Sequence, residues 1–360
     1  MTIQEVISSL EGLANPGLQE VYDNAGLITG NKNNECRGIL VALDVTEVIV
    51  QEAMDKKCNL IVAHHPVIFK GLKRITGTNY VERTIIKAIK NDIAIYAIHT
   101  NLDNVIHGVN SKLATLLHLK HCRVLSEKQH LLKKLEAFVP NDYAEIVRSA
   151  LFDAGAGSIG LYDQCSFNLD GTGTFRPLEG ANPFSGKKGE RFSGGETRIE
   201  VIFPFYIEDK LIRSLKNAHP YEEVAYYITS LTNTEKSTGS GMIGELEEER
   251  DEVAFLENLK KILNAKVLRH TRLLNKPIRK VAFCGGSGFF HLPVAIASGA
   301  DIYITADVKY HEFFDADEKL ILVDAGHFET EQFTIELLAD YLQNKFINFA
   351  VLKTGLQTNP

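Results

Sequence analysis

Short apolar runs alternate with amphipathic segments through the first third of the chain. Three runs predict buried strands at residues 38–43, 59–63 and 93–98, and two amphipathic segments predict helices at 47–56 and 80–90. Strands that alternate with helices in this order form a parallel sheet covered by helices. The first third is therefore predicted to be an α/β unit.

The same pattern returns near the end of the chain. Strands are predicted at residues 280–284, 301–305 and 320–323, and helices at 290–297 and 330–343. The two stretches resemble variations on one unit. We therefore predict two similar α/β halves that form one domain, built from residues 1–130 and 237–360.

The composition changes between these halves, from residue 131 to 236. The predicted order is strand, helix, a hairpin region rich in Gly, Ser and Asn, strand, helix and strand. Two βαβ-like halves of this size indicate an inserted ferredoxin-like α+β domain. Residues 171–195 are dense in glycine and poor in apolar residues, so we predict a long exposed loop. Residues 233–242 are predicted to be the returning linker.

The overall composition excludes several classes of protein. The chain has 360 residues, 44% hydrophobic content, 24% charged content and a net charge of −7. Basic residues are scattered among acidic ones, which argues against nucleic acid as a partner. The N-terminal segment predicts an amphipathic helix rather than a signal peptide, and no apolar run is long enough to cross a bilayer. Five cysteines without a C-x-x-C pair suit a cytoplasmic protein with reduced thiols.

Imidazoles and carboxylates follow the predicted strands at the positions where a parallel sheet binds ligands. In an open parallel sheet, ligands bind beyond the carboxyl ends of the strands. Four such ends carry residues of these types: His64 and His65; His99 and Asp103; Asp307 and His311; and Asp324, His327 and Glu331. Ligand types at all four ends predict a metal site there.

The spacing of these residues favours two ions over one. His327 and Glu331 are four residues apart at the start of a helix and would project from one face. His64 and His65 point in alternate directions along an extended backbone, so each is expected to hold a different ion. The predicted ligands are three imidazoles and two carboxylates, which suit Zn first, with Fe or Mn as alternatives, and Glu331 is favoured as the bridge: His64, His65, Asp103, His327 and Glu331.

Each residue also has a purely structural interpretation. Asp103 could cap a turn, Asp307 and Asp324 could cap helices or orient an imidazole, and a lone histidine after a strand is usually a hydrogen-bonded loop residue. The segment CGGSGFF, residues 284–290, is either a tight strand-to-helix turn or a phosphate cradle. Asp23 and Asn24 are either turn formers or pocket liners.

Six motifs together resemble a known family of dinuclear-metal proteins. In order they are DNAGL, AHHP, HTNLDN, CGGSG, KYHE and GHFETE. They resemble the motifs of the NGG-one-interacting-factor-three-like proteins, also called GTP cyclohydrolase I type 2 homologues. The segment AHPYEEVAYY, residues 218–227, is similar to the insert of the longer bacterial members, which resembles CutA-type and nitrogen-regulatory P-two proteins.

The resemblance implies a cytoplasmic, toroidal homohexamer with the same five metal ligands in each chain. In ADVKYHE the family usually has a glycine and a polar residue before the lysine, which leaves the role of Asp307 open. The expected function is a binuclear metal-dependent hydrolase, of the cyclohydrolase or phosphoesterase type, that acts on a nucleotide or phosphoester-type substrate.

In that reaction His99 or His311 would be the general acid or base, and Lys309 is either a phosphate contact or a solvated residue. The alternative is a metal-binding or regulatory scaffold whose insert senses a small molecule or protein partner. His219, Tyr221 and Glu222 in the insert could line a ligand site, although a helix-to-strand turn at Pro220 is the favoured explanation.

Overall fold

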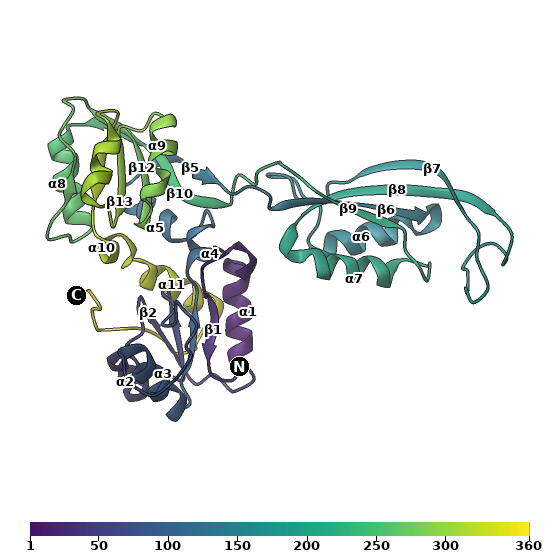
Figure 1. Ribbon diagram of the computed structural model, residues 1–360, viewed down its shortest axis with the longest axis horizontal. Helices are drawn as coiled ribbons and strands as arrows, with labels where there is room; N and C mark the ends of the chain where they lie inside the picture. The colour runs from purple at the N-terminus through teal and green to yellow at the C-terminus, as the bar shows by residue number, and fades with distance from the viewer. Residues whose placement is uncertain (360) are drawn as a thin grey trace. The chain divides into compact units, whose positions relative to one another are not determined.

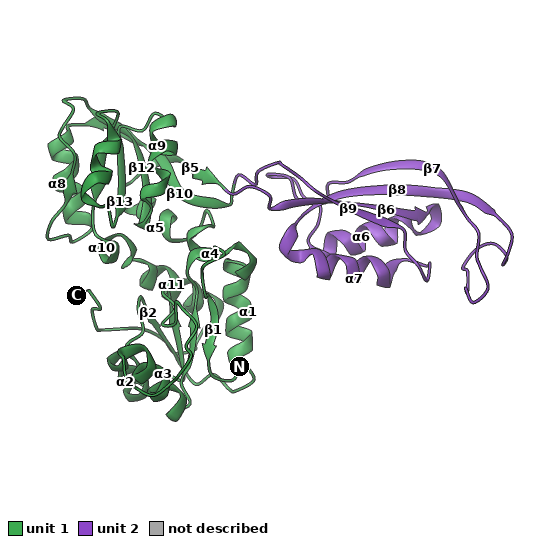
Figure 2. Cartoon of the chain, viewed as in Figure 1, with its two compact units in different colours: residues 1–127, 237–360 green, residues 128–236 purple. Residues whose placement is uncertain are grey.

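The computed structural model describes residues 1–359 and divides into two compact units (Figure 2). One unit contains residues 1–127 and 237–360, and the other contains residues 128–236. Both units combine helices with β-sheet, so the chain is a mixed α/β protein.

The first sheet of the larger unit has the strand order β1-β4-β3-β2-β15. Strands β2, β3, β4 and β15 pair in parallel, and β1 joins one edge in the antiparallel sense. The parallel core predicted from the first third of the sequence is therefore confirmed. The bounds are β1 Gly26–Thr29, β2 Ile39–Ala42, β3 Leu60–Ala63, β4 Ala94–Ala97 and β15 Val351–Lys353.

Helices cover both faces of this sheet, which explains why its central strands are apolar at every position. Ile39 and Val41 of β2 pack with α1 and α11, whereas Leu40 and Ala42 pack with α2 and α3, because successive side chains point to opposite faces. The helices near this sheet are α1 Ile3–Leu13, α2 Glu47–Asp55, α3 Tyr80–Lys90, α4 Thr100–Asp103 and α11 Thr334–Lys345, with the short helix η1 Pro16–Leu18 (Figure 1). Helix α5 Val109–Leu116 follows α4 and packs against the second sheet.

The second sheet of the larger unit has the order β11-β14-β13-β12-β10-β5. Its central strands β12, β13 and β14 are parallel, as predicted, and the other three strands pair in the antiparallel sense. The strands are β5 Lys120–Glu127, β10 Gly239–Arg250, β11 Arg269–His270, β12 Ile278–Ser287, β13 Ile302–Ala306 and β14 Ile321–Asp324; the helices are α8 Glu252–Ile262, α9 Leu292–Ala297 and α10 His327–Glu331, with η4 Phe289–His291 and η5 Tyr310–Ala316.

The predicted linker at 233–242 is wrong in part, because β10 already begins at Gly239. Gly239 pairs with Glu127, and Met242 pairs with both Val124 and Phe283. Gly241 has a φ of +67°, a conformation that favours glycine. The strand therefore starts in a glycine-rich segment that has no alternation of apolar and polar residues.

The smaller unit is a four-stranded antiparallel sheet packed against two helices. Its strand order is β7-β8-β6-β9, and α6 and α7 cover its apolar face. The predicted order of strands and helices is reproduced here. The elements are β6 Leu132–Pro140, η2 Asn141–Tyr143, α6 Ala144–Ala154, β7 Phe167–Phe175, β8 Phe192–Pro204, η3 Phe205–Ile207, α7 Glu208–Ala218 and β9 Tyr226–Ser230.

The prediction of one long loop at residues 171–195 is wrong. The ends of this segment belong to β7 and β8, which pair residue by residue, for example Gly173 with Gly194 and Phe175 with Phe192. This part of the hairpin is largely exposed, so no buried apolar face imposes an alternating pattern on the sequence. Only residues 176–191 connect the two strands.

Within residues 1–359, no helix combines the length and the apolar composition that crossing a membrane would require.

Candidate metal centre

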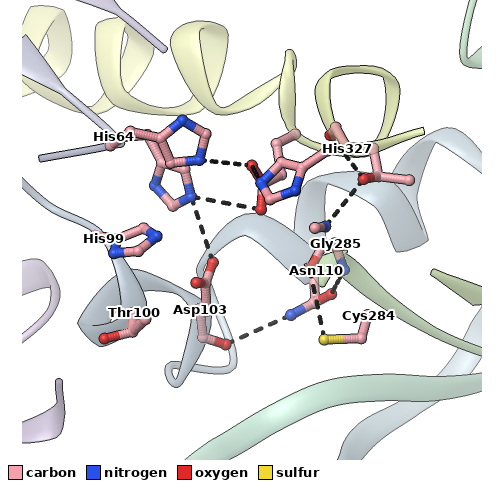
Figure 3. A network of polar contacts seen from close by, with 12 residues as sticks. His64, His99, Thr100, Asp103, Asn110, Cys284, Gly285 and His327 are labelled. Atoms are coloured by element: carbon pink, nitrogen blue, oxygen red, sulfur yellow. Dashed lines mark hydrogen bonds and ion pairs between the residues drawn. The ribbon is translucent and has the colours of Figure 1, made fainter. Parts of the chain in front are cut away.

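Side chains from the two sheets of the larger unit meet in one cluster (Figure 3). In the described part of the chain, ligand atoms that lie within 4.8 Å of one another form three overlapping groups. The groups are His64, His65 and His99; His65, His327 and Glu331; and His64, Asp103 and Glu331. All five predicted metal ligands and one predicted proton carrier therefore lie together.

The end of β3 explains how the two adjacent histidines are presented. The backbone N–H of His64 donates to Ala42 and that of His65 donates to Leu43, so the pairing with the neighbouring segment continues past the strand. The extended backbone sends the two imidazoles in different directions. Their ring centroids lie 4.9 Å apart with planes inclined by 44°.

Glu331 stands between the two histidines. It projects from α10 on the same face as His327, and its Oε2 lies 2.9 Å from His65 Nε2 and 3.0 Å from His327 Nε2. Its Oε1 lies 3.8 Å from His64 Nε2, which in turn lies 3.7 Å from Asp103 Oδ1. The two oxygens of this carboxylate therefore face two different sets of ligands.

A second layer of acceptors fixes the orientation of each imidazole. His64 Nδ1 lies 2.9 Å from the carbonyl oxygen of Ile98. The other three Nδ1 atoms each contact a carboxylate, at 2.7 to 2.8 Å: His65 with Asp44, His327 with Asp307, and His99 with Asp23. An Nδ1–H that donates outward leaves Nε2 with its lone pair toward the cluster, as in carboxylate–histidine–metal arrangements.

The buried His64 imidazole provides a test of whether the site suits a metal. His64 is 0% exposed, and its Nε2 has no hydrogen-bond partner among residues 1–359. Burial lowers the pKa of His64, so the ring is a neutral ligand rather than a cation. A buried nitrogen without a partner costs free energy unless something binds it, and a divalent cation would do so.

The other groups hold protons that a metal would displace. Burial lowers the pKa of His65, but hydrogen bonds to Asp44 and Glu331 outweigh it and raise the value to about 10. Burial likewise opposes a rise for His327, yet the hydrogen bond to Glu331 raises its pKa to about 9. Burial and the neighbouring Glu331 raise the pKa of Asp103 well above its ordinary value. Binding of cations would therefore release protons.

Glu331 is the permanent anion of this cluster. Burial alone would raise its pKa, but the contacts with His327 and His65 and the nearby His64 imidazole hold the pKa well below the ordinary range. A buried carboxylate, 3% exposed and surrounded by three imidazoles, is the donor set that borderline divalent ions prefer.

The glycines of CGGSGFF make room for Glu331 instead of cradling a phosphate. Gly286 has a φ of +64°, and a Cβ placed on it would overlap Glu331 Oε1. The N–H groups of the three glycines donate to Asn110, Thr330 and Thr305 at 2.9 to 3.0 Å. Those N–H groups are already occupied, so the phosphate-cradle interpretation finds no support.

His311 is not brought to the cluster. It lies in the short helix η5, is exposed, and contacts the rings of Tyr310 and Phe314. It belongs to none of the three ligand groups of the described chain. The turn of η5 carries it away, while Asp307 at the end of β13 reaches His327. Lys309 is also exposed, with 83% of its side chain accessible.

Sequence reasoning missed Asp44, which follows β2 and holds His65. The rule that located the other residues, polar side chains directly after apolar strands, would have found it if applied to the first strand. Asp324, considered as a cap or an orienting group, accepts hydrogen bonds from the N–H groups of Val308 and Gly326. Asp23 holds His99, and the side-chain amide of Asn24 donates to the carbonyl oxygen of Ile68.

A cavity of about 320 Å³ opens beside His65 and His327. This volume falls within the range of small-molecule sites. Aromatic residues Phe69, Tyr80 and Phe328 contribute to its wall, and the residues that line it include no Lys or Arg. Positive charge for an anionic ligand would therefore come from protonated His65 and His327, or from cations that replace their protons.

Known proteins resemble this chain over its full length. The family described as Duf34/NIF3 (NGG1p interacting factor 3) matches residues 1–360. A Bacillus subtilis protein named GTP cyclohydrolase 1 type 2 homolog is 39% identical and covers 99% of this chain and 97% of its own length. A protein of the same name from Halalkalibacterium halodurans is 40% identical over 99% of this chain and 97% of its own.

Solved structures agree. The crystal structure of a Bacillus cereus protein related to NIF3 has a TM-score of 0.86 at 40% identity and covers 100% of this chain and 98% of that one. Staphylococcus aureus protein SA1388 has a TM-score of 0.78 at 28% identity, with coverage of 100% and 98%. By its sequence and fold, the chain belongs to the Duf34/NIF3 family.

Proposed function

We propose that the protein is a dinuclear divalent-metal hydrolase. The observation that carries the proposal is the position of Glu331, whose two oxygens face two separate sets of ligands. His64 and Asp103 with Oε1 would hold one ion, and His65 and His327 with Oε2 would hold the other. Zn is the first expectation for such imidazole and carboxylate ligands, with Fe or Mn as alternatives.

A pair of ions in this cluster would lower the pKa of a bound water and neutralise charge that develops on an oxygen of the substrate. The protein's own contribution is to fix the ligands. The outer carboxylates Asp44 and Asp307 orient the imidazoles of His65 and His327, and the burial of His64 and Glu331 strengthens the electrostatic interactions around them.

His99 is the best candidate for moving a proton. Its Nδ1 contacts Asp23 at 2.8 Å, and its ring lies 5.2 Å from that of His64 and 5.3 Å from that of His65. Its Nε2 is therefore the nitrogen left to act at the cluster. A histidine held by a carboxylate beside the reacting group is a common general acid or base.

The cavity beside His65 and His327 supports a small substrate with a flat or apolar part. Its aromatic wall suits a ring, and an anionic group would face the ions, because no Lys or Arg lines the cavity and its two imidazoles would hold a metal. Together with the names of the relatives, this favours a nucleotide or phosphoester-type substrate.

Three further expectations remain part of this proposal. Residues 131–236 would be an inserted ferredoxin-like domain, which the strand order β7-β8-β6-β9 and the element order of that unit support. The chain would assemble into a toroidal homohexamer, and it would act in the cytoplasm.

The test is a turnover screen with purified protein of known metal content. Nucleoside triphosphates, nucleoside monophosphates and p-nitrophenyl phosphate would be offered to the parent, to Glu331→Gln and to the control Glu329→Gln, which changes a neighbouring carboxylate on α10. We expect turnover by the parent and the control, and loss of at least a hundredfold in Glu331→Gln. If ions are bound but no substrate is turned over, the protein is a metal-binding or regulatory scaffold rather than a hydrolase.

A further inference from the structure

A second cavity, of about 450 Å³, lies entirely within residues 128–236. None of the residues that line it belongs to the metal cluster. Its volume is that of a small-molecule site. It lies between the end of the β7–β8 hairpin, part of the connection 176–191 and the turn before β9, and this turn contains the AHPYEE segment that the metal centre does not use.

Four aromatic side chains contribute to its wall: Phe138, Phe175, Phe184 and Tyr221. Tyr221 lies at the centre of this group, with ring centroids 5.7 Å from Phe175 and 6.0 Å from Phe184. These separations are typical of mutually packed rings. The faces of such rings carry negative electrostatic potential, which attracts cations.

The polar groups of the wall are predominantly anionic. Three carboxylates line the cavity, Glu196, Glu222 and Glu223, against one guanidinium, Arg176. The Tyr221 hydroxyl donates to Glu196 Oε1 at 3.0 Å, and Glu222 Oε1 accepts the N–H of Asn182 at 2.8 Å. Two of the carboxylates are thus held in place by neighbours that also belong to this region.

The turn that presents Tyr221 is itself anchored. The buried His219 contacts the carbonyl oxygen of Phe138 through Nε2 at 3.0 Å and accepts the N–H of Tyr221 at Nδ1, also at 3.0 Å. Partial burial and the hydrogen bond to Glu196 raise the pKa of Tyr221 to about 12, so the phenol stays neutral at physiological pH. The cavity is therefore lined by a prearranged combination of aromatic faces and carboxylates.

We propose that this cavity binds a small organic cation, an amine or quaternary ammonium group on a compact organic body. Aromatic faces and a fixed carboxylate are the two features that recognise such groups, because the cation gains from the rings while its counter-charge is already in place. An anionic ligand would meet three carboxylates and one guanidinium. A neutral ligand would leave the net negative charge of the wall uncompensated.

The test compares two ligands of the same shape on the full chain. Choline carries a quaternary ammonium, and 3,3-dimethyl-1-butanol replaces its nitrogen by carbon. Binding of each is measured by isothermal titration calorimetry and by ligand-observed NMR at fixed ionic strength. We expect choline to bind and the alcohol to bind at least tenfold more weakly. Equal binding of both, or no binding of choline at 10 mM, would overturn the proposal.

Variants locate the site. Glu196→Gln keeps the shape of the wall and removes one of its negative charges. Phe184→Leu removes one exposed ring with little risk to folding. We expect each to weaken choline binding about fivefold or more. The control Asp153→Asn removes one negative charge from α6 of the same unit, outside the cavity. A control that weakens binding as much as Glu196→Gln would show non-specific attraction and refute the site.

Discussion

The replacement Gly286→Ala should empty the metal centre while leaving the fold in place. Gly286 lies on β12 with a φ of +64°, and an added Cβ would overlap Glu331 Oε1 and approach His327 Nε2 to 3.2 Å. The backbone conformation alone costs an L-residue about 1–2 kcal/mol. The carboxylate must also move, and it is the group that both sets of ligands share.

The expected loss of metal affinity follows from the displacement of Glu331. Losing even an outer orienting group typically weakens metal affinity by about 10–100-fold, equivalent to about 1.4–2.7 kcal/mol, and displacing the shared ligand should cost at least as much. We expect Gly286→Ala to retain less than a tenth of the parent's metal after dialysis against a weak chelator. Elemental analysis measures the retained metal, and thermal unfolding measures the loss of stability.

Gly160 provides a matched control for this experiment. Its φ is +58°, close to that of Gly286, but a Cβ placed there meets nothing within 4 Å. Gly160→Ala should therefore carry the backbone cost without touching the site, and it should keep its metal. If Gly286→Ala binds as much metal as Gly160→Ala, the view that Glu331 needs the space beside Gly286 is refuted.

Three other replacements probe orientation, acid stability and packing. Asp44→Asn removes the charge that holds His65 Nδ1, and should weaken one of two metal-binding steps by about 10–100-fold in calorimetric titrations; unchanged affinity would contradict the orienting role. Glu82 accepts hydrogen bonds from the backbone N–H groups of Thr76 and Thr78, which lower its pKa from 4.5 to about 2. The ionised Glu82 therefore stabilises the folded protein above pH 4.5, and this stabilisation is lost as the pH falls toward 2. Glu82→Gln should accordingly speed amide exchange at Thr76 at pH 7, and the difference from the parent should vanish near pH 2. Leu60→Ala removes a side chain that is 0% exposed and should destabilise the protein by about 2–5 kcal/mol in denaturant unfolding; a loss below 1 kcal/mol would contradict the packing described.

The parallel core and the ligand cluster were predictable because both follow from local pattern. β3 is apolar at every position and is followed directly by His64, a pattern that indicates burial on both faces and a polar group at the edge where ligands bind. The spacing of His327 and Glu331 fixes their shared face. These features need no knowledge of the remote contacts.

The antiparallel edges were not predictable in this way. β1 is half-buried at all four positions, and β10 begins with glycines, so neither shows the alternation that marks a strand. Their positions depend on remote partners, such as Tyr96 for Leu27 and Val124 for Met242. The pairing of distant segments has no signature within the strand itself.

Other parts of the site become evident only when side chains are placed. The need for glycine at position 286 depends on where the Glu331 carboxylate lies. The exclusion of His311 depends on the direction in which η5 leaves β13, which the KYHE motif does not encode. Sequence position alone therefore identified candidates for proton transfer, and geometry selected His99 over His311.

The most direct test of the central claim is a count of bound metal in the parent and in three single variants. Two sets of ligands that share Glu331 predict about two divalent ions per chain in the parent, about one in Asp103→Ala and in His327→Ala, and fewer than half an ion in Glu331→Ala. Elemental analysis with an accurate protein concentration measures all four. A parent that binds one ion, or a Glu331→Ala variant that keeps one ion fully bound, would contradict a dinuclear centre bridged by this carboxylate.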